Sequence, residues 1–339
     1  MTRPLELTRA QILAQRRSVQ VLDERLPASP DALRRAAFAG LQDSVPRSAL
    51  HALHARVEAV TPVAWEDPSL IQVWGPRYTA YLVPAGDAAI FTLARLPESG
   101  PLRVRAEELA LRLSAHLGGR RMTYGQAGQA LGVHPNSLRY ASLTGTVLIR
   151  WEGARQPTVW TVPAPAIDAV EARRELARRY LRWYGPTTAD AFARWAGIDG
   201  PAAHATFEEL GASLTPVRSA LGDAWILAAD EPSFRAAARP PAPARLLPSG
   251  DPYYLLHGRD REFLVPDAEH RALLWTPRVW PGALLVAGEV AGTWRRSRAV
   301  VIVAPWRPLS RAERDAVEAE AGSLPLPGVD SPVTVRWSD

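Results

Sequence analysis

The amino-acid sequence predicts an α+β fold in which three tandem winged-helix motifs precede a C-terminal antiparallel β module. Two observations lead to this prediction. Helical stretches followed by short apolar runs, the order of a winged helix, recur three times within residues 1–238. A proline-rich stretch, "RPPAPARLLP" at 239–248, then precedes apolar segments that alternate with Gly and Pro turns. We therefore expect four domains, at residues 1–100, 101–165, 166–238 and 239–339.

The first unit begins with an amphipathic helix for which Thr8 is the expected N-cap. A second helix starts at Ser29-Pro30, because serine caps a helix and proline suits its first position, and we expect Gly40 to end it. A third helix follows in "PRSALHALHARVEAV". The apolar runs around Gly75-Pro76 and Gly86-Asp87 predict strands joined by tight turns.

The second unit repeats this order. A helix in "RAEELALRLSAHLG" precedes a shorter one that we expect to start after Thr123 and to end at Gly132. With "HPNSLRYASLTG" this shorter helix predicts a helix-turn-helix, and two strands are predicted on either side of Glu152-Gly153. The second helix of the pair would face a DNA groove. It carries His134, Asn136, Ser137 and Arg139.

The third unit contains three helical stretches and the apolar run "AWILAA". Beyond the proline-rich stretch, "PYYLLHG", "REFLVP", "ALLWTP" and "GALLVAGEVAGTWRRSRAVVIVAPW" predict an antiparallel β module. A last helix follows, in which Ser310 and Glu313 have the spacing of a capping box.

Composition limits the chemistry of this 339-residue chain. It contains no cysteine, which excludes disulfides and thiolate zinc sites. His51 and His54 have helical spacing, but without a His-Glu-x-x-His pattern we interpret them as polar residues on a helix face and expect no metal. Lysine is also absent, so no side-chain amine can form a Schiff base. Attack on a sugar carbon would therefore need water or a carboxylate.

The charge distribution indicates a polyanionic partner. The chain carries a formal charge of +5. Residues 101–180 alone hold twelve arginines against six acidic residues. A solvated, arginine-rich helix face is the alternative interpretation. No apolar run is long enough to span a bilayer and the N-terminus is polar, so we expect a cytoplasmic protein without a membrane partner.

Five stretches together resemble the winged-helix DNA glycosylases of the AlkZ and YcaQ type, bacterial enzymes associated with unhooking DNA interstrand crosslinks and removing N-alkylated purines. They occur in the family's order between residues 8 and 320 and read "GLQDSVPRSAL", "WEDPSLIQVWGPRYTAYLVPAGD", "RRELARRYLRWYGPTTADAFARWAGI", "LLPSGDPYYL" and "GEVAGTWRR". The resemblance implies three winged helices with a concave basic face for double-stranded DNA. It also implies hydrolysis of an N-glycosidic bond by water.

The resemblance locates the catalytic motif at Gln42, Asp43 and Ser44. The family uses Gln-x-Gln or Gln-x-Asp, so Gln42 matches the first position and Ser44 departs from the third. A serine hydroxyl is shorter than either family side chain, and Asp43 would compensate if it faced inward. Asp43 or Ser44 could instead cap a helix that starts near Val45-Pro46.

Further residues are candidates for contacts with DNA. Arg77 matches a family arginine. Tyr81 stands where the family has histidine, and it could equally be a core residue. Asp251 matches an acidic residue of the family that either orients a loop or approaches the cleft. The complete set of candidates for DNA binding is Arg47, Arg77, Tyr81, Arg120, Arg121, His134, Asn136 and Arg139.

The resemblance therefore implies a monofunctional glycosylase that hydrolyses N7-linked alkylated purines with water as nucleophile and no cofactor. Whether it acts on crosslinks or single adducts stays open. We expect a monomer associated with the bacterial nucleoid. One alternative is a DNA- or lesion-binding protein on the same scaffold that lost catalysis when the motif changed. A winged-helix transcription factor is less favoured, because no heptad run predicts a dimer.

Overall fold

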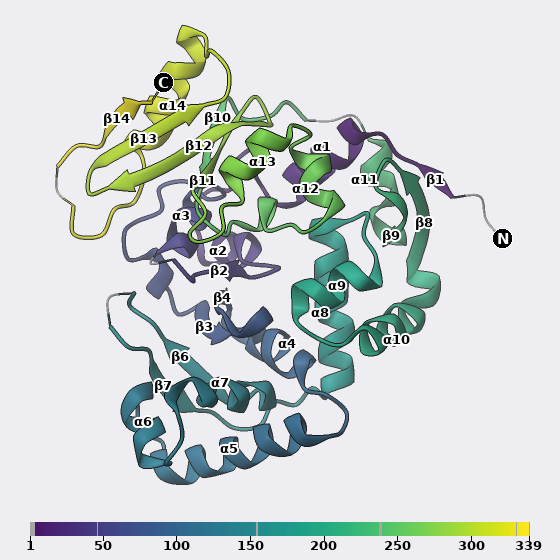
Figure 1. Cartoon of the computed structure of the whole chain (residues 1–339), viewed down its shortest axis with the longest axis vertical. Coiled ribbons are helices and arrows are strands. Elements are labelled where there is room, and N and C mark those ends of the chain that lie inside the picture. Colours follow the sequence, from purple (N-terminus) through teal and green to yellow (C-terminus); the bar gives the residue numbers. More distant parts are fainter. Residues whose placement is uncertain (1–3, 46, 154, 237–238, 330, 339) are drawn as a thin grey trace.

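The computed structural model describes residues 4–45, 47–153, 155–236, 239–329 and 331–338 (Figure 1). Helices of the first unit are α1 (Arg9–Val19), α2 (Pro30–Ala36), α3 (Ser48–His54) and α4 (Ala88–Thr92). Its strands are β2 (Leu41–Gln42), β3 (Leu70–Trp74) and β4 (Ala80–Pro84). The predicted caps are confirmed: the Thr8 side chain accepts from the Gln11 amide, and the Ser29 side chain accepts from the Ala32 amide.

Three boundaries in the first unit differ from the prediction. The apolar run after Gly86-Asp87 forms the helix α4 rather than a strand. Its residues Ile90, Phe91 and Thr92 are buried. Helix α3 ends at His54, since Val57 pairs with Leu26 in a parallel bridge. Helix α2 ends before Gly40, and the short strand β2, which the sequence analysis did not predict, follows that glycine directly.

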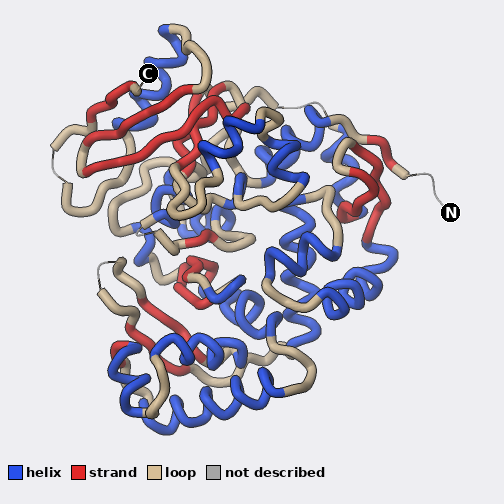
Figure 2. The backbone as a smooth tube through the Cα atoms, in the orientation of Figure 1, coloured by secondary structure: helices blue, strands red, loops and turns tan. Residues whose placement is uncertain are grey.

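The second unit contains the helices α5 (Pro101–Leu117), α6 (Tyr124–Ala130) and α7 (Leu138–Ala141). Its strands are β5 (Met122–Thr123), β6 (Val147–Arg150) and β7 (Thr158–Thr161). The first two units share one six-stranded antiparallel sheet with the order β2-β4-β3-β6-β7-β5, in which Gln72 of β3 pairs with Ile149 of β6. Strand β2 therefore lies at one edge of the sheet and the second unit at the other (Figure 2).

The third unit consists of α8 (Ala169–Tyr184), α9 (Ala189–Ala196), α10 (Gly200–Leu210), β8 (Leu214–Ser219), β9 (Gly222–Leu227) and α11 (Glu231–Arg235). The N-terminal strand β1 (Leu5–Glu6) pairs in parallel with β8 (Figure 1). Strand β8 was missed in the sequence because Pro216 and its polar neighbours weaken the apolar alternation.

The second and third units share one order of elements, whereas in the first unit α1 and α2 both precede β2 and α3 is the α-helix between β2 and the β3–β4 pair. In the second unit, helix α5, strand β5, helices α6 and α7 and the β6–β7 pair follow one another, and β5 pairs with β7. The third unit has the same order, with a bridge from Thr187 to Trp225 of β9 in place of the first strand. In the first unit, β2 pairs with β4 in the corresponding place.

The C-terminal module is a mixed sheet with three helices. The strands are β10 (Ala244–Leu247), β11 (Gly282–Val286), β12 (Glu289–Ser297), β13 (Val300–Pro305) and β14 (Thr334–Trp337). The helices are α12 (Arg259–Leu264), α13 (Ala268–Leu274) and α14 (Arg311–Gly322). The capping box of Ser310 and Glu313 is confirmed.

The prediction of a purely antiparallel module is wrong in two respects. Strand β14 runs parallel to β13. The stretches "REFLVP" and "ALLWTP" form α12 and α13, where the Asp267 side chain caps α13 by accepting from the His270 amide. "PYYLLHG" begins with a 3₁₀ turn at Pro252–Tyr254.

The largest hydrophobic core joins elements that are far apart in the sequence. Leu41 of β2, Phe192 of α9 and Leu285 of β11 belong to the same buried cluster. A second cluster lies under α14 and its sheet, and a third fills the second unit. Within the described ranges, none of the helices combines the length and the apolar character needed to cross a lipid bilayer.

Candidate active site

Gln42 is the last residue of the edge strand β2, and Asp43 and Ser44 follow it directly. Gln42 pairs with Tyr81 of β4, and the Asp43 amide continues the ladder to the Ala80 carbonyl at 2.8 Å. Because the Asp43 amide continues the ladder, the Asp43 side chain faces the side opposite to that of Gln42, where it contacts Ala49 and Gln72. The Gln42 Nε2 donates to Ser44 Oγ at 2.6 Å, which holds these two side chains together.

The Gln42 amide oxygen is a buried acceptor. Its Oε1 has no hydrogen-bond partner within the part of the chain that the structure describes. The loop that precedes Asp251 covers it: a Cβ on Gly250 would lie 3.4 Å from that oxygen. Gly250 has φ +76°, a conformation that favours glycine. Two stretches of the motif set, 200 residues apart, therefore meet at Gln42.

Asp43 is 2% exposed and supports helix α3. Its Oδ1 accepts from the Ala49 amide at 3.1 Å and its Oδ2 from Gln72 Nε2 at 2.8 Å. Arg47, at the N-cap position, has a left-handed φ of 66° and gives no side-chain cap, so Asp43 takes over that function. Burial raises the pKa of Asp43 to about 6. Of the expected helix start at Val45-Pro46, Pro46 lies outside the described residues, and α3 begins at Ser48.

Gln72 connects this motif to the second unit. It is 3% exposed, and its Oε1 accepts from the Trp151 amide at 2.7 Å while its Nε2 donates to Asp43. Arg47 donates to the Trp151 carbonyl at 3.3 Å. The guanidinium groups of Arg47 and Arg150 lie 3.7 and 4.0 Å from the ring centre of Trp65, so two cations stack on one indole beside the motif.

Arg77 and Tyr81 lie in and after the turn between β3 and β4. The Arg77 Nη1 is 2.7 Å from His257 Nε2. Burial, and then the nearby Arg77, lower the pKa of His257 to about 4, so its neutral ring accepts this hydrogen bond. Tyr81 is 1% exposed and packs in the core. A Cβ at Gly40 would come within 2.9 Å of the Tyr81 ring, which explains why glycine precedes the motif.

Asp251 forms a buried ion pair with Arg56. The Arg56 Nη1 and Nη2 donate to the Asp251 oxygens at 2.7 and 2.8 Å, and both side chains are 0% exposed. The Asp251 Oδ1 also accepts from the Tyr253 amide at 2.9 Å, in the Asx turn that the sequence suggested. Arg56 follows α3, so this pair anchors the Gly250 loop to the helix beside Gln42.

The remaining candidates belong to the second unit and are not brought together with Gln42. Arg120 donates to the Leu117 carbonyl at 3.1 Å, and Arg121 stacks on Trp160 with its guanidinium 4.3 Å from the ring centre. The other three lie around the 3₁₀ turn before α7. The His134 ring accepts from the Asn136 amide at 3.2 Å, Asn136 accepts from the Tyr124 hydroxyl at 3.1 Å, and Arg139 lies on α7.

The histidine pair on α3 is buried rather than exposed on a polar face. Burial is the main cause that lowers the pKa of His51 to about 4 and that of His54 to about 3. The His54 Nε2 lies 2.9 Å from Ser323 Oγ, so the helix that carries the motif packs against the end of α14. In the described ranges no three His, Asp or Glu side chains gather in a way that could hold a metal ion.

Sequence reasoning missed Arg56, Gln72 and His257. Arg56 offered one signal: it is a charged residue inside the apolar stretch "LHARVEAV". Gln72 interrupts the apolar strand β3 in the same way. The position of His257 after "PYYLL" carries no local signal, because its partner Arg77 lies 180 residues away.

Comparison with known proteins places the chain in a family. The family model described as DNA glycosylase AlkZ-like matches residues 33–325. The chain belongs to the AlkZ-like DNA glycosylase family. The resemblance seen in the sequence is therefore confirmed, and Gln42, Asp43, Arg77 and Asp251 all lie within the matched region.

This AlkZ-like chain is similar to a characterised protein of Streptomyces sahachiroi. It is 26% identical over 299 residues to an interstrand DNA cross-link repair glycosylase, covering 76% of this chain and 79% of the relative. Among solved structures, the Streptomyces sahachiroi DNA glycosylase AlkZ matches with a TM-score of 0.81 and 22% identity, covering 98% of this chain and 100% of that chain. The two proteins therefore share a mixed α+β fold over nearly their whole length.

Proposed function

We propose that this AlkZ-like protein is a monofunctional DNA glycosylase that hydrolyses the N-glycosidic bond of N7-alkylated purines, in interstrand crosslinks as well as in single adducts. One observation carries the proposal. The Gln42 side chain is held by Ser44 and covered by the Gly250 loop, and its amide oxygen has no partner among the described residues. The name of the Streptomyces sahachiroi relative, a cross-link repair glycosylase, supports crosslinked DNA as a substrate.

In this reaction the C1′–N9 bond of the damaged nucleotide breaks, and the cationic base leaves as a neutral molecule with the bonding electron pair. The sugar acquires oxocarbenium character, and a water oxygen then bonds to C1′ and loses one proton to solvent. The amide oxygen of Gln42 accepts a hydrogen bond from that water and presents partial negative charge to the sugar. Because Gly250 lies over this oxygen, the loop has to move aside for a water to reach it.

Ser44 assists by orienting Gln42 in this proposal. It accepts from the Gln42 amide nitrogen, so the amide oxygen is directed away from Ser44. The hydroxyl hydrogen remains available to a water, because Ser44 is exposed. Asp43 has a different role, since it faces Gln72 and the start of α3. We therefore assign Asp43 to the support of the motif rather than to the chemical step.

We also propose that the three units are winged helices with the boundaries 1–100, 101–165 and 166–238, followed by the module 239–339. The order of elements and the return pairing of a first strand with the hairpin in each unit support this interpretation. The second unit would hold the DNA backbone. Its candidate contacts are Arg120, Arg121, His134, Asn136 and Arg139.

Release of N7-methylguanine from a methylated duplex, measured by chromatography, tests the enzymatic proposal. The wild type should release the free base, and Gln42→Ala should lose about 100-fold or more of that rate, the order of magnitude found when one stabilising group of a polar transition state is removed. Gln42→Ala should still bind the duplex. DNA binding by the wild type without any base release would instead support a lesion-binding protein and contradict the enzymatic proposal.

A further inference from the structure

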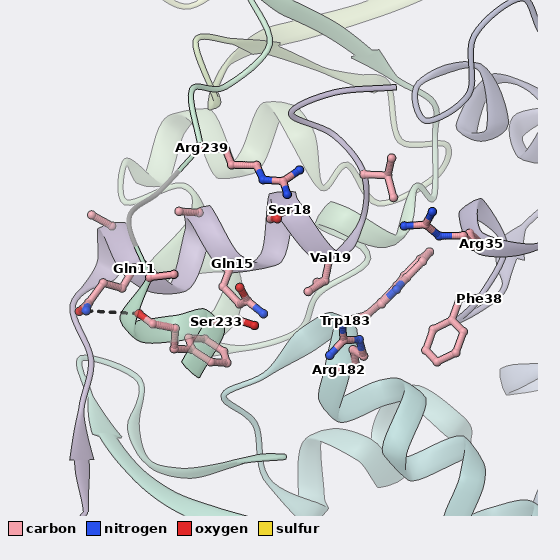
Figure 3. A pocket seen from close by; sticks show the side chains of 15 residues that line it. Gln11, Gln15, Ser18, Val19, Arg35, Phe38, Arg182, Trp183, Ser233 and Arg239 are labelled. Carbon is pink, nitrogen blue, oxygen red and sulfur yellow. Dashed lines mark hydrogen bonds between the residues drawn. The ribbon is translucent and has the colours of Figure 1, made fainter. Parts of the chain in front are cut away.

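A cavity of about 580 Å³ lies between α1, α2, the end of α8 and α11 (Figure 3). This volume is in the range of small-molecule sites, about 300 to 1,000 Å³. None of Gln42, Asp43 and Ser44 lines it. Its wall includes the aromatic rings of Phe38 and Trp183, whose centres are 6.5 Å apart.

The charged side chains on the wall favour an anionic ligand. Arg35, Arg182 and Arg239 line the cavity, and no acidic residue in the described part of the chain does so. Arg182 forms an ion pair with Asp230. Arg35 and Arg239 form no ion pair within 4 Å among the described residues, although the charge of Arg239 also acts on the nearby Asp23 carboxylate. Figure 3 shows both arginine side chains reaching toward the cavity from separate segments. Guanidinium groups bind phosphate oxygens with two parallel hydrogen bonds.

A buried amide adds a hydrogen-bond donor to this site. Gln15 of α1 is only 7% exposed, and its Nε2 has no acceptor within the described ranges. Figure 3 shows its amide directed from α1 into the cavity, toward the side where Arg182 and Trp183 lie. Leaving a buried N–H without a partner is costly, so this group is suited to an acceptor on a bound molecule.

A buried carboxylate supplies an acceptor next to the cavity. Asp23 lines an adjoining hollow of about 270 Å³ that shares Ser18, Val21, Arg35 and Arg239 with the cavity. Its side chain is 4% exposed. One oxygen accepts from Arg17 Nε at 2.9 Å, and Oδ2 has no partner in the described part of the chain. That oxygen can accept from a ligand hydroxyl or amine.

We propose that this cavity is a second ligand site and that it binds a nucleoside phosphate. The phosphate would lie between the guanidinium groups of Arg35 and Arg239. The base would pack on Phe38 and accept from the Gln15 amide, with the buried Trp183 behind Phe38. A sugar hydroxyl or a base amine would donate to Asp23. An inorganic anion would account for the arginines and the Gln15 donor, but not for the Asp23 acceptor or the aromatic part of the wall.

Calorimetric titration of the full-length protein with deoxyguanosine 5′-monophosphate tests this proposal, with inorganic phosphate, deoxyguanosine and a short single-stranded oligonucleotide as comparisons. The nucleotide should bind more tightly than phosphate or the nucleoside. Arg35→Gln should weaken that binding by about tenfold, the equivalent of one charge-assisted contact. Gln15→Met, which removes the donor at similar volume, should weaken it several-fold.

Arg34→Gln is the matched control. Arg34 lies beside Arg35 on the same helix, pairs with the exposed Asp31 at 3.2 Å and does not line the cavity, so nucleotide binding should stay unchanged. Gln42→Ala should also leave it unchanged, which separates this test from that of the glycosylase proposal. Thermal melting of each variant checks that it is folded.

Three results would overturn the proposal: no binding of the nucleotide at about 1 mM, equal affinity for inorganic phosphate, or equal losses in Arg34→Gln and Arg35→Gln. If the oligonucleotide binds more tightly than the mononucleotide and depends on Arg35, the bound nucleotide belongs to a nucleic-acid strand. If the mononucleotide binds more tightly, the ligand is a free nucleotide. Both of these results support a nucleoside phosphate as the ligand.

Discussion

Replacing Asp43 by asparagine separates a buried support from a catalytic group. The asparagine oxygen can still accept from the Ala49 amide, but its NH₂ group would meet the Nε2 of Gln72, which now donates to Asp43 at 2.8 Å. Gln72 cannot turn its amide without losing the bond from the Trp151 amide to its Oε1, at 2.7 Å. The variant therefore leaves a buried donor unpaired, which costs roughly 1–3 kcal/mol of the free energy of unfolding.

The same substitution removes a titration. Burial raises the pKa of Asp43 in the folded protein to about 6, above the value of an unfolded chain. The native state therefore binds more protons than the unfolded state between roughly pH 4 and pH 6. The stability that Asp43 contributes is fully present below about pH 4 and is lost as the pH rises through 6. A difference of about two pKa units between the folded and unfolded states corresponds to about 3 kcal/mol in the free energy of unfolding. About 2 kcal/mol of this is gained when the pH is lowered from 7 to 4.5.

Urea unfolding followed by fluorescence of the 12 tryptophans measures this effect at pH 7 and pH 4.5. Asparagine does not titrate. The contributions of the other ionisable groups to the pH dependence of stability cancel when the variant is compared with the wild type. The wild type should therefore gain about 2 kcal/mol over Asp43→Asn on acidification, and the variant should still release base at pH 7. A difference that is independent of pH, or loss of base release in a fully stable variant, would refute this reasoning.

Three further predictions concern the surroundings of the motif. Asp251→Ala leaves the buried Arg56 guanidinium unpaired and should lower the free energy of unfolding by about 3–5 kcal/mol, measured in urea. Gly250→Ala should cost about 1–2 kcal/mol because of its positive φ, and should slow base release because its methyl group would occupy the space against the Gln42 amide oxygen that a water needs. Gly328→Ala, also at positive φ but in open space, should leave base release unchanged. Replacing Arg120, Arg121 and Arg139 together by alanine should weaken binding to all duplexes. The slope of the logarithm of the binding constant against the logarithm of the salt concentration should fall by about 3 in magnitude. An unchanged slope in a binding titration would contradict a role of these arginines in phosphate contacts.

Local signals predicted the helices well because capping depends on residues three positions apart. Thr8, Ser29, Thr123 and Ser310 were all expected caps, and each accepts a hydrogen bond from its own helix. The errors arose where tertiary packing decides the structure. The run at α4 has the apolar content of a strand, and its burial against α8 makes it helical instead.

The supporting residues of the site could not be found from the sequence, because their partners are remote. The Arg56–Asp251 pair spans 195 residues, and the Gln72–Trp151 contacts span 79. The motif itself was found through its likeness to a family, yet the division of roles within it depends on β2, a strand of two residues. Such a short strand leaves too few positions for an alternating pattern to be recognised.

The position of the motif at the end of strand β2 explains how Gln42 can be held in place although serine stands in the third position of the motif. The Gln42 amide is fixed by a short side chain: its Nε2 donates to the Oγ of Ser44 at 2.6 Å. On the opposite side Asp43 connects α3 to Gln72, and through Gln72 to the second unit, which carries most of the candidate DNA contacts.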